Sequence, residues 1–178
     1  MLTLTLFRHA KSSWAEPSMP DFDRPLAPRG EEAAPRMGAF LAGRGLVPDL
    51  ILCSTARRTR ETHDLAFAAL PRPETQFLDA IYHATVPALL AIIRAAPADT
   101  RHLMLIGHNP GLQALALKLI GGGDPDGRRE IAHKFPSAAI AAMSFDAAGW
   151  SAVQPGGGHL LFFMAPRQLP APLSGSRS

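Results

Sequence analysis

Short apolar runs alternate along this chain with longer stretches in which apolar side chains recur at helical spacing. The apolar runs predict strands over residues 2–7, 50–54, 102–108, 138–145 and 159–165, and an edge strand within 72–79. Helical spacing is found over residues 29–44, 56–69, 86–95 and 110–120. Strands that alternate with helices are typical of an α/β fold. We therefore expect a three-layer α/β/α sandwich with a mainly parallel central sheet and helices on both faces.

Proline and glycine mark the connections between these elements. Residues 14–28 contain four prolines and predict a long loop, and the Gly-, Asp- and Pro-rich residues 121–128 predict another. Pro35 lies inside the helix predicted for residues 29–44. Because proline lacks a backbone N–H, that helix is expected either to begin near Glu31 or to bend at the proline.

The composition is that of one globular protein. Of the 178 residues, 47% are hydrophobic and 19% are charged, which suits a single core. We expect one domain over residues 1–166 and a flexible tail over 167–178, which is rich in Pro, Ser and Gly. The single cysteine, Cys53, excludes an internal disulfide and a cysteine-based zinc site, and it fits a cytoplasmic protein. The apolar N-terminus reaches Arg8 after seven residues, too few for a signal peptide.

Charge and hydropathy narrow the range of partners. The formal charge of +3 comes from scattered arginines, and the chain has only one Tyr and two Trp that could stack on bases. No segment offers the ~18 consecutive apolar residues that a membrane-spanning helix needs. We therefore expect a protein that binds neither nucleic acid nor membrane, and we assume that it is a monomer.

Three of the predicted strands end in polar groups that suit an anion. These groups are Arg8, His9, Lys11 and Ser12 after the first strand, Ser54 followed by Arg57, Arg58 and Arg60 after the second, and His108 with Asn109 after the strand at 102–108. In open α/β sheets, ligands bind at the carboxyl ends of the strands. If the three strands are neighbours, these groups form one pocket.

The residue types in this pocket suit a phosphoryl group. Arginine binds phosphate oxygens in a bidentate manner, and a histidine whose reactive nitrogen is deprotonated can attack phosphorus. We expect Asn109 to cap the following helix and Pro110 to occupy its first position, so that free backbone N–H groups face the same anion. A P-loop and a Gly-x-Gly-x-x-Gly motif are both missing from the sequence.

The order of the motifs resembles a known family. The chain carries Arg-His-x-x-Ser after a strand, then Ser-x-Ala-x-Arg-x-x-x-Thr, then Gly-His-Asn after another strand. This order is similar to that of the histidine phosphatase superfamily, also called phosphoglycerate-mutase-like. The run RHAKSSW…DFDRPLAPRG resembles the small SixA-type phosphohistidine phosphatases. The resemblance extends over about residues 2–165 and implies the phosphoglycerate-mutase-like fold.

The resemblance also implies a role for each matching residue. His9 is the nucleophile that becomes phosphorylated, Arg8 and Arg58 hold the phosphoryl oxygens, and His108 contacts the group in transfer. Ser12 is expected near the phosphate, with Lys11 and Asn109 as rim contacts. No metal or organic cofactor is implied. The expected substrate is a phosphorylated protein or a small phosphate compound.

One departure from the family bears on the substrate. Larger members carry a carboxylate general acid in a Leu-x-Glu stretch, where this chain has Ala80. Other side chains that could replace it are Asp79, His83, Glu16, Asp21 and Asp23. A phosphohistidine has a labile P–N bond and needs less protonation of its leaving group than an alkyl phosphate does. The departure therefore favours phosphohistidine as the substrate.

Three other functions remain open from the sequence. One is a broad small-molecule phosphomonoesterase of the same fold, and another is a non-catalytic module that binds phosphorylated proteins. The third is a metallohydrolase that uses His9, His83 and His108, which the absence of a His-x-His or His-x-x-x-His pair disfavours.

Overall fold

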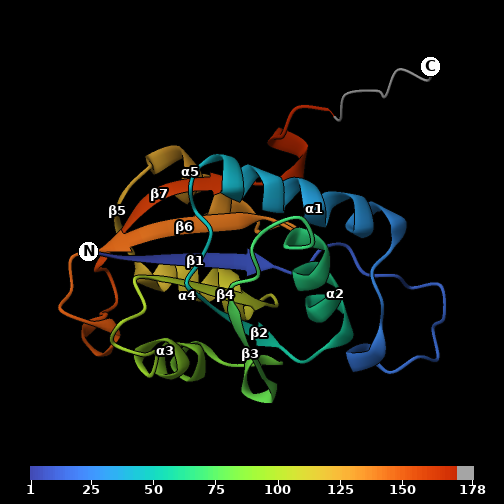
Figure 1. Cartoon of the computed structure of the whole chain (residues 1–178), viewed down its shortest axis with the longest axis horizontal. Coiled ribbons are helices and arrows are strands. Elements are labelled where there is room, and N and C mark those ends of the chain that lie inside the picture. Colours follow the sequence, from blue (N-terminus) through green and yellow to red (C-terminus); the bar gives the residue numbers. More distant parts are fainter. Residues whose placement is uncertain (172–178) are drawn as a thin grey trace.

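The computed structural model describes residues 1–171 and centres on a seven-stranded sheet of order β3-β2-β4-β1-β6-β7-β5 (Figure 1). The strands are β1 (Leu2–Arg8), β2 (Leu50–Ser54), β3 (Glu74–Leu78), β4 (His102–Gly107), β5 (Ile120–Gly123), β6 (Ile140–Phe145) and β7 (Gly158–Met164). Strand β6 runs antiparallel to both of its neighbours, and the other four pairings are parallel. The mainly parallel sheet and the edge position of β3 are therefore confirmed.

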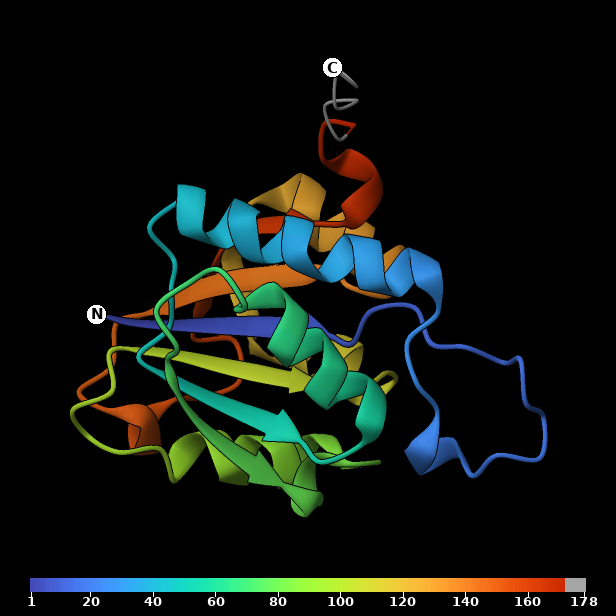
Figure 2. The ribbon, with the colours of Figure 1, turned by 45° about the vertical axis from the view of Figure 1, so that its right-hand side comes forward.

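Helices cover both faces of this sheet, as Figures 1 and 2 show. The helices are α1 (Pro28–Gly43), α2 (Arg57–Ala66), α3 (Val86–Arg94), α4 (Gly111–Leu119) and α5 (Pro125–His133). Helices α1 and α2 pack on one face, and α3, α4 and α5 pack on the other. The predicted three-layer α/β/α sandwich is confirmed.

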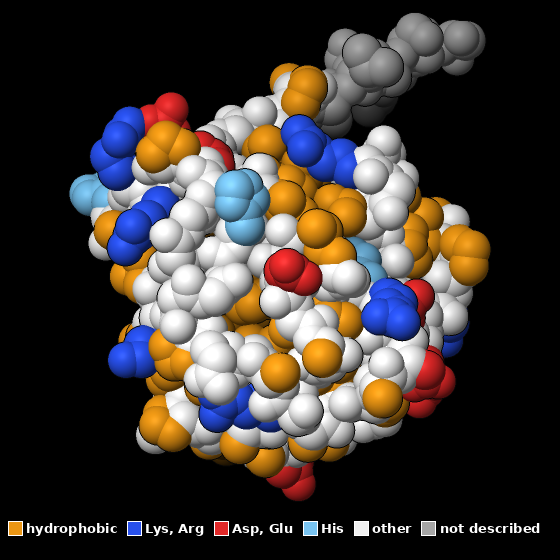
Figure 3. Space-filling model, turned by 90° about the vertical axis from the view of Figure 1, so that its left-hand side faces the viewer, with side chains coloured by type: hydrophobic (Ala, Val, Ile, Leu, Met, Phe, Trp, Pro, Cys, Tyr) orange, Lys and Arg blue, Asp and Glu red, His pale blue; other side chains and the backbone are white. Residues whose placement is uncertain are grey.

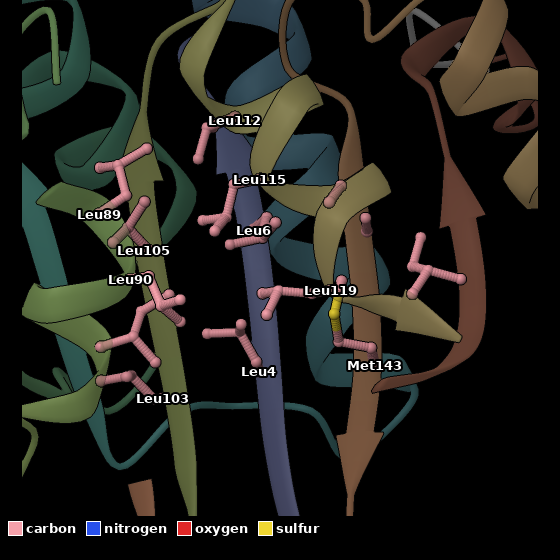
Figure 4. Close-up of a cluster of buried hydrophobic side chains, with 14 of the residues drawn as sticks. Leu4, Leu6, Leu89, Leu90, Leu103, Leu105, Leu112, Leu115, Leu119 and Met143 are labelled. Atoms are coloured by element: carbon pink, nitrogen blue, oxygen red, sulfur yellow. The ribbon is translucent and has the colours of Figure 1, made fainter. Parts of the chain in front are cut away.

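A hydrophobic core lies on each face of the sheet. Each central strand contributes side chains to both cores, because successive side chains of a strand point to opposite faces of the sheet. In β1, Leu4 and Leu6 belong to the core under α3, α4 and α5, whereas Phe7 belongs to the core under α1 and α2. Figure 4 shows Leu6 beside Leu115 of α4, and Leu4 nearer Leu119 of the same helix. These strands are largely apolar because both of their faces are buried.

The prediction of a loop over residues 121–128 is wrong, because β5 and α5 occupy this segment. Helix α5 has Pro125 at its start, and the Asp124 side chain accepts a hydrogen bond from the Asp126 backbone N–H. The glycines of β5 allow a close approach of two backbones. A Cβ on Gly121 would lie 1.8 Å from the Gly156 carbonyl oxygen, so glycine is required there.

The structure also shows where the helices predicted over residues 29–44 and 110–120 begin. Helix α1 begins at Pro28 and continues through Pro35, whose side chain is exposed on the outer face of the helix. Helix α4 begins at Gly111, so Pro110 is the cap residue and the predicted cap is displaced by one position. Asn109 still serves the helix start, because its Oδ1 accepts a hydrogen bond from the Gln113 backbone N–H at 3.3 Å.

The C-terminal boundary predicted at residue 166 lies within a packed segment. Residues Pro166–Gln168 form a 3₁₀ turn, and Leu169 packs against the core under α1 and α2. The Arg36 guanidinium also donates to the Pro170 carbonyl at 2.7 Å. The remainder of the predicted tail, residues 172–178, lies outside the described residues. Within residues 1–171, every helix is too short or too polar to cross a membrane.

Candidate active site

The three strands that end in anion-binding groups are neighbours in the sheet, in the order β2-β4-β1. Arg8 is the last residue of β1, Ser54 is the last residue of β2, and His108 directly follows β4. All three strands are parallel, so their carboxyl ends lie at one edge of the sheet (Figure 2). The rings of His9 and His108 lie 5.3 Å apart between their centroids. The structure therefore brings the groups at these strand ends together.

The His9 ring is held in one orientation by the backbone. Its Nδ1 lies 2.8 Å from the Ala10 carbonyl oxygen, which only accepts hydrogen bonds, so Nδ1 carries the proton. Ala10 is itself held, because its backbone N–H donates to Thr62 Oγ1 at 2.9 Å. In the neutral ring the other nitrogen, Nε2, then has a free lone pair. This is the state that a nucleophilic histidine requires.

Burial and three arginines keep His9 neutral. Its side chain is 7% exposed, and burial followed by the charges of Arg58, Arg8 and Arg24 lowers the pKa of His9 to about 3, despite the opposing hydrogen bond to Ala10. The same three cations attract an anion to the ring that they keep deprotonated. His9 is therefore an uncharged base beside a concentrated positive charge.

His108 completes the opposite side of the pocket. Its Nε2 lies 2.7 Å from Ser54 Oγ, and burial together with the neighbouring His9 and Arg58 lowers the pKa of His108 to about 3. Two buried side-chain polar atoms within residues 1–171 lack a hydrogen-bond partner, and they are His108 Nδ1 and Arg8 Nε. Buried polar atoms in folded proteins are normally paired, and both exceptions belong to the predicted site.

Arg58 is positioned by an acidic residue of the proline-rich loop. Its guanidinium donates to the Asp21 carbonyl at 2.6 Å and to Asp21 Oδ2 at 3.1 Å, and Tyr82 Oη donates to the same Oδ2 at 2.6 Å. Partial burial raises the pKa of Asp21, but the hydrogen bonds from Tyr82 and Arg58 outweigh it and hold that pKa well below its usual range. Asp21 is therefore a carboxylate that orients Arg58, which retains other N–H donors for a phosphoryl group.

Arg24 is a site residue that the sequence analysis did not predict. It comes from the proline-rich loop, is 6% exposed, and its guanidinium donates to Asp21 Oδ1 at 2.9 Å and to Ser12 Oγ. Its Cζ also lies 3.3 Å from the centroid of the Trp14 ring. Ser12 thus contacts Arg24 within the site. The sequence showed only an arginine in a long proline-rich loop.

The other polar residues predicted near the phosphate have different surroundings. Lys11 is exposed and lines a separate cleft with Arg8. Asn109 Nδ2 donates to the Phe135 carbonyl at 3.1 Å, so its amide contacts backbone. Arg57 and Arg60 are exposed on α2, consistent with a solvated helix face.

The side chains that could replace the missing general acid differ in their surroundings. Asp79 accepts a hydrogen bond from Thr55, whereas Glu16 and Asp23 are exposed on the proline-rich loop. His83 is exposed, its Nε2 lies 3.6 Å from Asp21 Oδ2, and its ring is parallel to that of His108 at 6.5 Å. His83 also has a φ of 53°, a left-handed conformation that is uncommon for a residue with a side chain.

An apolar pocket of about 360 Å³ adjoins His108. Ile81, Val86, Leu89 and Leu112 contribute to its lining, and His83 lies at the same pocket. The described residues include no group of three or more His, Cys, Asp or Glu side chains arranged to hold a metal ion.

The comparisons with known proteins agree with this geometry. A sequence profile of the histidine phosphatase superfamily (branch 1) matches residues 4–82. An uncharacterized protein of Mycobacterium tuberculosis is 36% identical over 162 residues, which cover 90% of this chain and 99% of that protein. The chain therefore belongs to the histidine phosphatase superfamily.

Solved structures place it among the SixA-type members. A structure from Agrobacterium tumefaciens, provisionally assigned as the phosphohistidine phosphatase SixA, is 31% identical, with a TM-score of 0.79 over 93% of this chain and 98% of that one. A structure from Nakamurella multipartitia with the same provisional assignment is 30% identical to this chain, with a TM-score of 0.81 over 93% of this chain and 96% of that one. The protein histidine phosphatase SixA complexed with tungstate shares the fold, with a TM-score of 0.77 at 21% identity over 95% and 100%.

The low pKa of His9 makes a prediction about stability. A histidine with a folded pKa of about 3 and an unfolded pKa near 6.5 takes up a proton on unfolding between these values, so stability falls as the pH falls. We expect His9→Asn to reduce this dependence by ~1.4 kcal/mol per pH unit between about pH 6 and pH 5. Urea unfolding of both proteins across this range measures the difference. Equal slopes would contradict a neutral, buried His9.

Proposed function

We propose that this phosphatase removes the phosphoryl group of a phosphohistidine on another protein, through a phosphohistidine intermediate at His9. The observation that supports this proposal most is the state of His9. Its Nδ1–H is held by the Ala10 carbonyl, so Nε2 is free beside three arginines. Attack on a phosphoryl group requires a neutral nucleophile and cationic groups already in place around it.

The proposed reaction has two displacements at phosphorus. His9 Nε2 attacks and a new N–P bond forms. The N–P bond to the substrate imidazole breaks, and its electron pair stays on the leaving nitrogen, so that an imidazole protonated on its other ring nitrogen departs as a neutral group. Arg8, Arg58 and Arg24 stabilise the charge on the phosphoryl oxygens. The bound dianion also raises the pKa of His108, so that this ring can donate to an oxygen. Water then attacks phosphorus and releases inorganic phosphate and neutral His9.

The residues around the leaving group favour a P–N bond. Asp21, the carboxylate nearest Arg58, is held as an anion and has no proton to give. An alkyl phosphate needs a proton on its leaving oxygen, an effect worth ~10²–10⁴-fold in rate. A leaving imidazole carries its own basic nitrogen and depends less on such a donor. The site therefore supports phosphohistidine more than an unactivated ester.

A small phosphate ester is the second candidate substrate, and the apolar pocket beside His108 favours it. A volume of about 360 Å³ lined by aliphatic side chains could receive the apolar part of a small alcohol. His83 lines this pocket and its Nε2 lies 3.6 Å from Asp21 Oδ2. In that reaction His83 is the side chain placed to protonate the leaving oxygen.

The test compares the two substrate types directly. Wild-type protein, freed of metal by chelation, is given a phosphohistidine-bearing protein or an alkyl phosphate ester, and phosphate release is measured. We expect the phosphohistidine to be hydrolysed and the ester to be cleaved at least about 10²-fold more slowly. Equal rates would favour the esterase and make His83→Ala the next variant. Binding of phosphate analogues without any hydrolysis would favour the binding module.

The predictions about metal, cellular compartment, oligomeric state and nucleic acid are also part of this proposal. The reaction as written needs no metal, and elemental analysis of active protein checks this requirement. The one cysteine, Cys53, is buried, which suits a reducing compartment such as the cytoplasm. A monomer that binds no nucleic acid also remains a prediction.

A further inference from the structure

A second cleft adjoins the candidate active site through Arg8. It has a volume of about 610 Å³ and lies between α1, residues 134–138 and the 3₁₀ turn at 166–168. The backbone links it to the nucleophile, because the Ala138 N–H donates to the His9 carbonyl at 3.0 Å. Arg8 spans the two sites, with its guanidinium donating to the Phe135 carbonyl at 2.8 Å.

The cleft concentrates the positive charge of the molecule. Its cationic side chains are Arg8, Lys11, Arg29, Arg36, Lys134 and Arg167, and its one carboxylate is Glu32. These charges give the cleft a net charge of +5, whereas the whole chain has a formal charge of only +3, so the rest of the chain is net negative. Figure 3 shows the end of the molecule at the amino ends of the strands, where Lys and Arg are dispersed instead.

Most of these cations are available for a ligand. Within residues 1–171, the side chains of Lys11, Arg29 and Lys134 make no hydrogen bond or ion pair. Arg36 donates only to a neutral backbone carbonyl, and Arg167 lies 3.9 Å from its nearest carboxylate, Glu130. An uncompensated group of cations on one surface repels itself and attracts an acidic partner.

The arrangement of the cations indicates which kind of anion they bind. Arg29 and Arg36 lie two turns apart on one face of α1, while Lys11, Lys134 and Arg167 come from three other segments. Long, exposed side chains spread over such a cleft match several carboxylates along a chain better than one phosphate. No aromatic side chain lines the cleft for base stacking, which disfavours a nucleic acid.

We propose that this basic cleft binds an acidic segment of the protein substrate, next to the phosphohistidine that enters the active site. The inference rests on the proposed function, since it assigns part of the substrate to a second surface. The cleft and His9 share Arg8 and the backbone around Ala138, so an extended segment can contact both. Attraction between opposite charges then speeds encounter and selects the partner.

The test uses two synthetic phosphohistidine peptides, one flanked by Glu and Asp and one by Ser and Gly. The variant is Arg29→Glu with Lys134→Glu, two exposed positions outside the catalytic group. Its matched control is Arg101→Glu with Arg72→Glu, which makes the same charge change at exposed positions near the amino ends of β4 and β3. A small phosphoramidate reports the activity that does not depend on the cleft.

We expect wild type to prefer the acidic peptide by about tenfold in kcat/KM at low salt, mainly through KM. The preference should disappear in the cleft variant and at high salt, and it should persist in the control variant. All three proteins should hydrolyse the phosphoramidate equally. A preference that survives in the cleft variant, or falls equally in the control, would overturn the proposal.

Binding of the unphosphorylated acidic peptide, followed by fluorescence anisotropy, separates the two proposals. If no phosphohistidine is hydrolysed but this peptide binds wild type and not the cleft variant, the proposed function fails and the cleft assignment stands. If hydrolysis occurs without preference and without peptide binding, the cleft assignment fails and the function stands. Tighter binding of a single-stranded oligonucleotide than of the peptide would also overturn the assignment.

Discussion

His9→Asn is expected to lower the turnover of a phosphohistidine substrate by about 10⁴-fold or more. The asparagine amide can replace the Nδ1–H that donates to the Ala10 carbonyl, so the backbone around it is retained. The variant has no nitrogen with a lone pair to attack phosphorus, and the covalent intermediate is lost. Rates of phosphate release and acid-quench trapping of a phosphoenzyme measure the two effects.

His159→Asn provides the matched control for this variant, because His159 is exposed on β7. We expect that control to keep wild-type turnover and to form the phosphoenzyme. His9→Asn should still bind inorganic phosphate, since the three arginines remain. Trapping of a phosphoenzyme in His9→Asn would move the nucleophile to another residue, with His108 the first to test.

Arg58→Gln should lower kcat/KM by about 10³-fold. Arg58 is 5% exposed and its charge acts on His9, so this charge is little screened by solvent. The substitution removes a cation that stabilises charge on the phosphoryl oxygens. It also removes the ion pair between Arg58 and Asp21 and leaves Asp21 paired with Arg24. Steady-state kinetics on a phosphohistidine peptide measure the loss.

Arg60→Gln is the control for Arg58, because both residues lie on α2 and Arg60 is exposed. Its kcat/KM should stay within about twofold of wild type, as for most surface substitutions. Thermal unfolding of both variants checks that the fold is retained. Equal losses in the two variants would show that α2 contributes only a general positive charge and that Arg58 has no particular role.

The positions of Arg8, Ser54 and His108 followed from the sequence alone. Each comes at the end of an apolar run, and in a parallel sheet such runs end at the same edge. The local sequence was sufficient to place these residues, because each of them is at the end of a strand or directly follows it. The parallel sheet and the two helical layers could be predicted for the same reason.

The residues of the proline-rich loop could not be placed in this way. Asp21 and Arg24 reach Arg58 and Ser12 across the site, and the separations in sequence are 37 and 12 residues. Nothing in the local pattern sets the path of a loop, because its course depends on contacts with elements elsewhere. The sequence therefore predicted a long loop without showing that it supplies a third arginine.

Residues 121–133 are another segment whose structure depends on contacts that are distant along the chain. Four glycines and two aspartates predicted a loop, yet the backbone of β5 pairs with β7, and the close approach to Gly156 admits no larger residue at Gly121. The basic cleft is a further case, since its cations are isolated along the chain and meet only when α1, residues 134–138 and the turn at 166–168 pack together. The sequence by itself determined the family motifs and every strand except β5, because these depend on neighbouring residues. The tertiary structure decided how Arg58 is oriented and where the charge gathers, because those depend on residues that are distant along the chain.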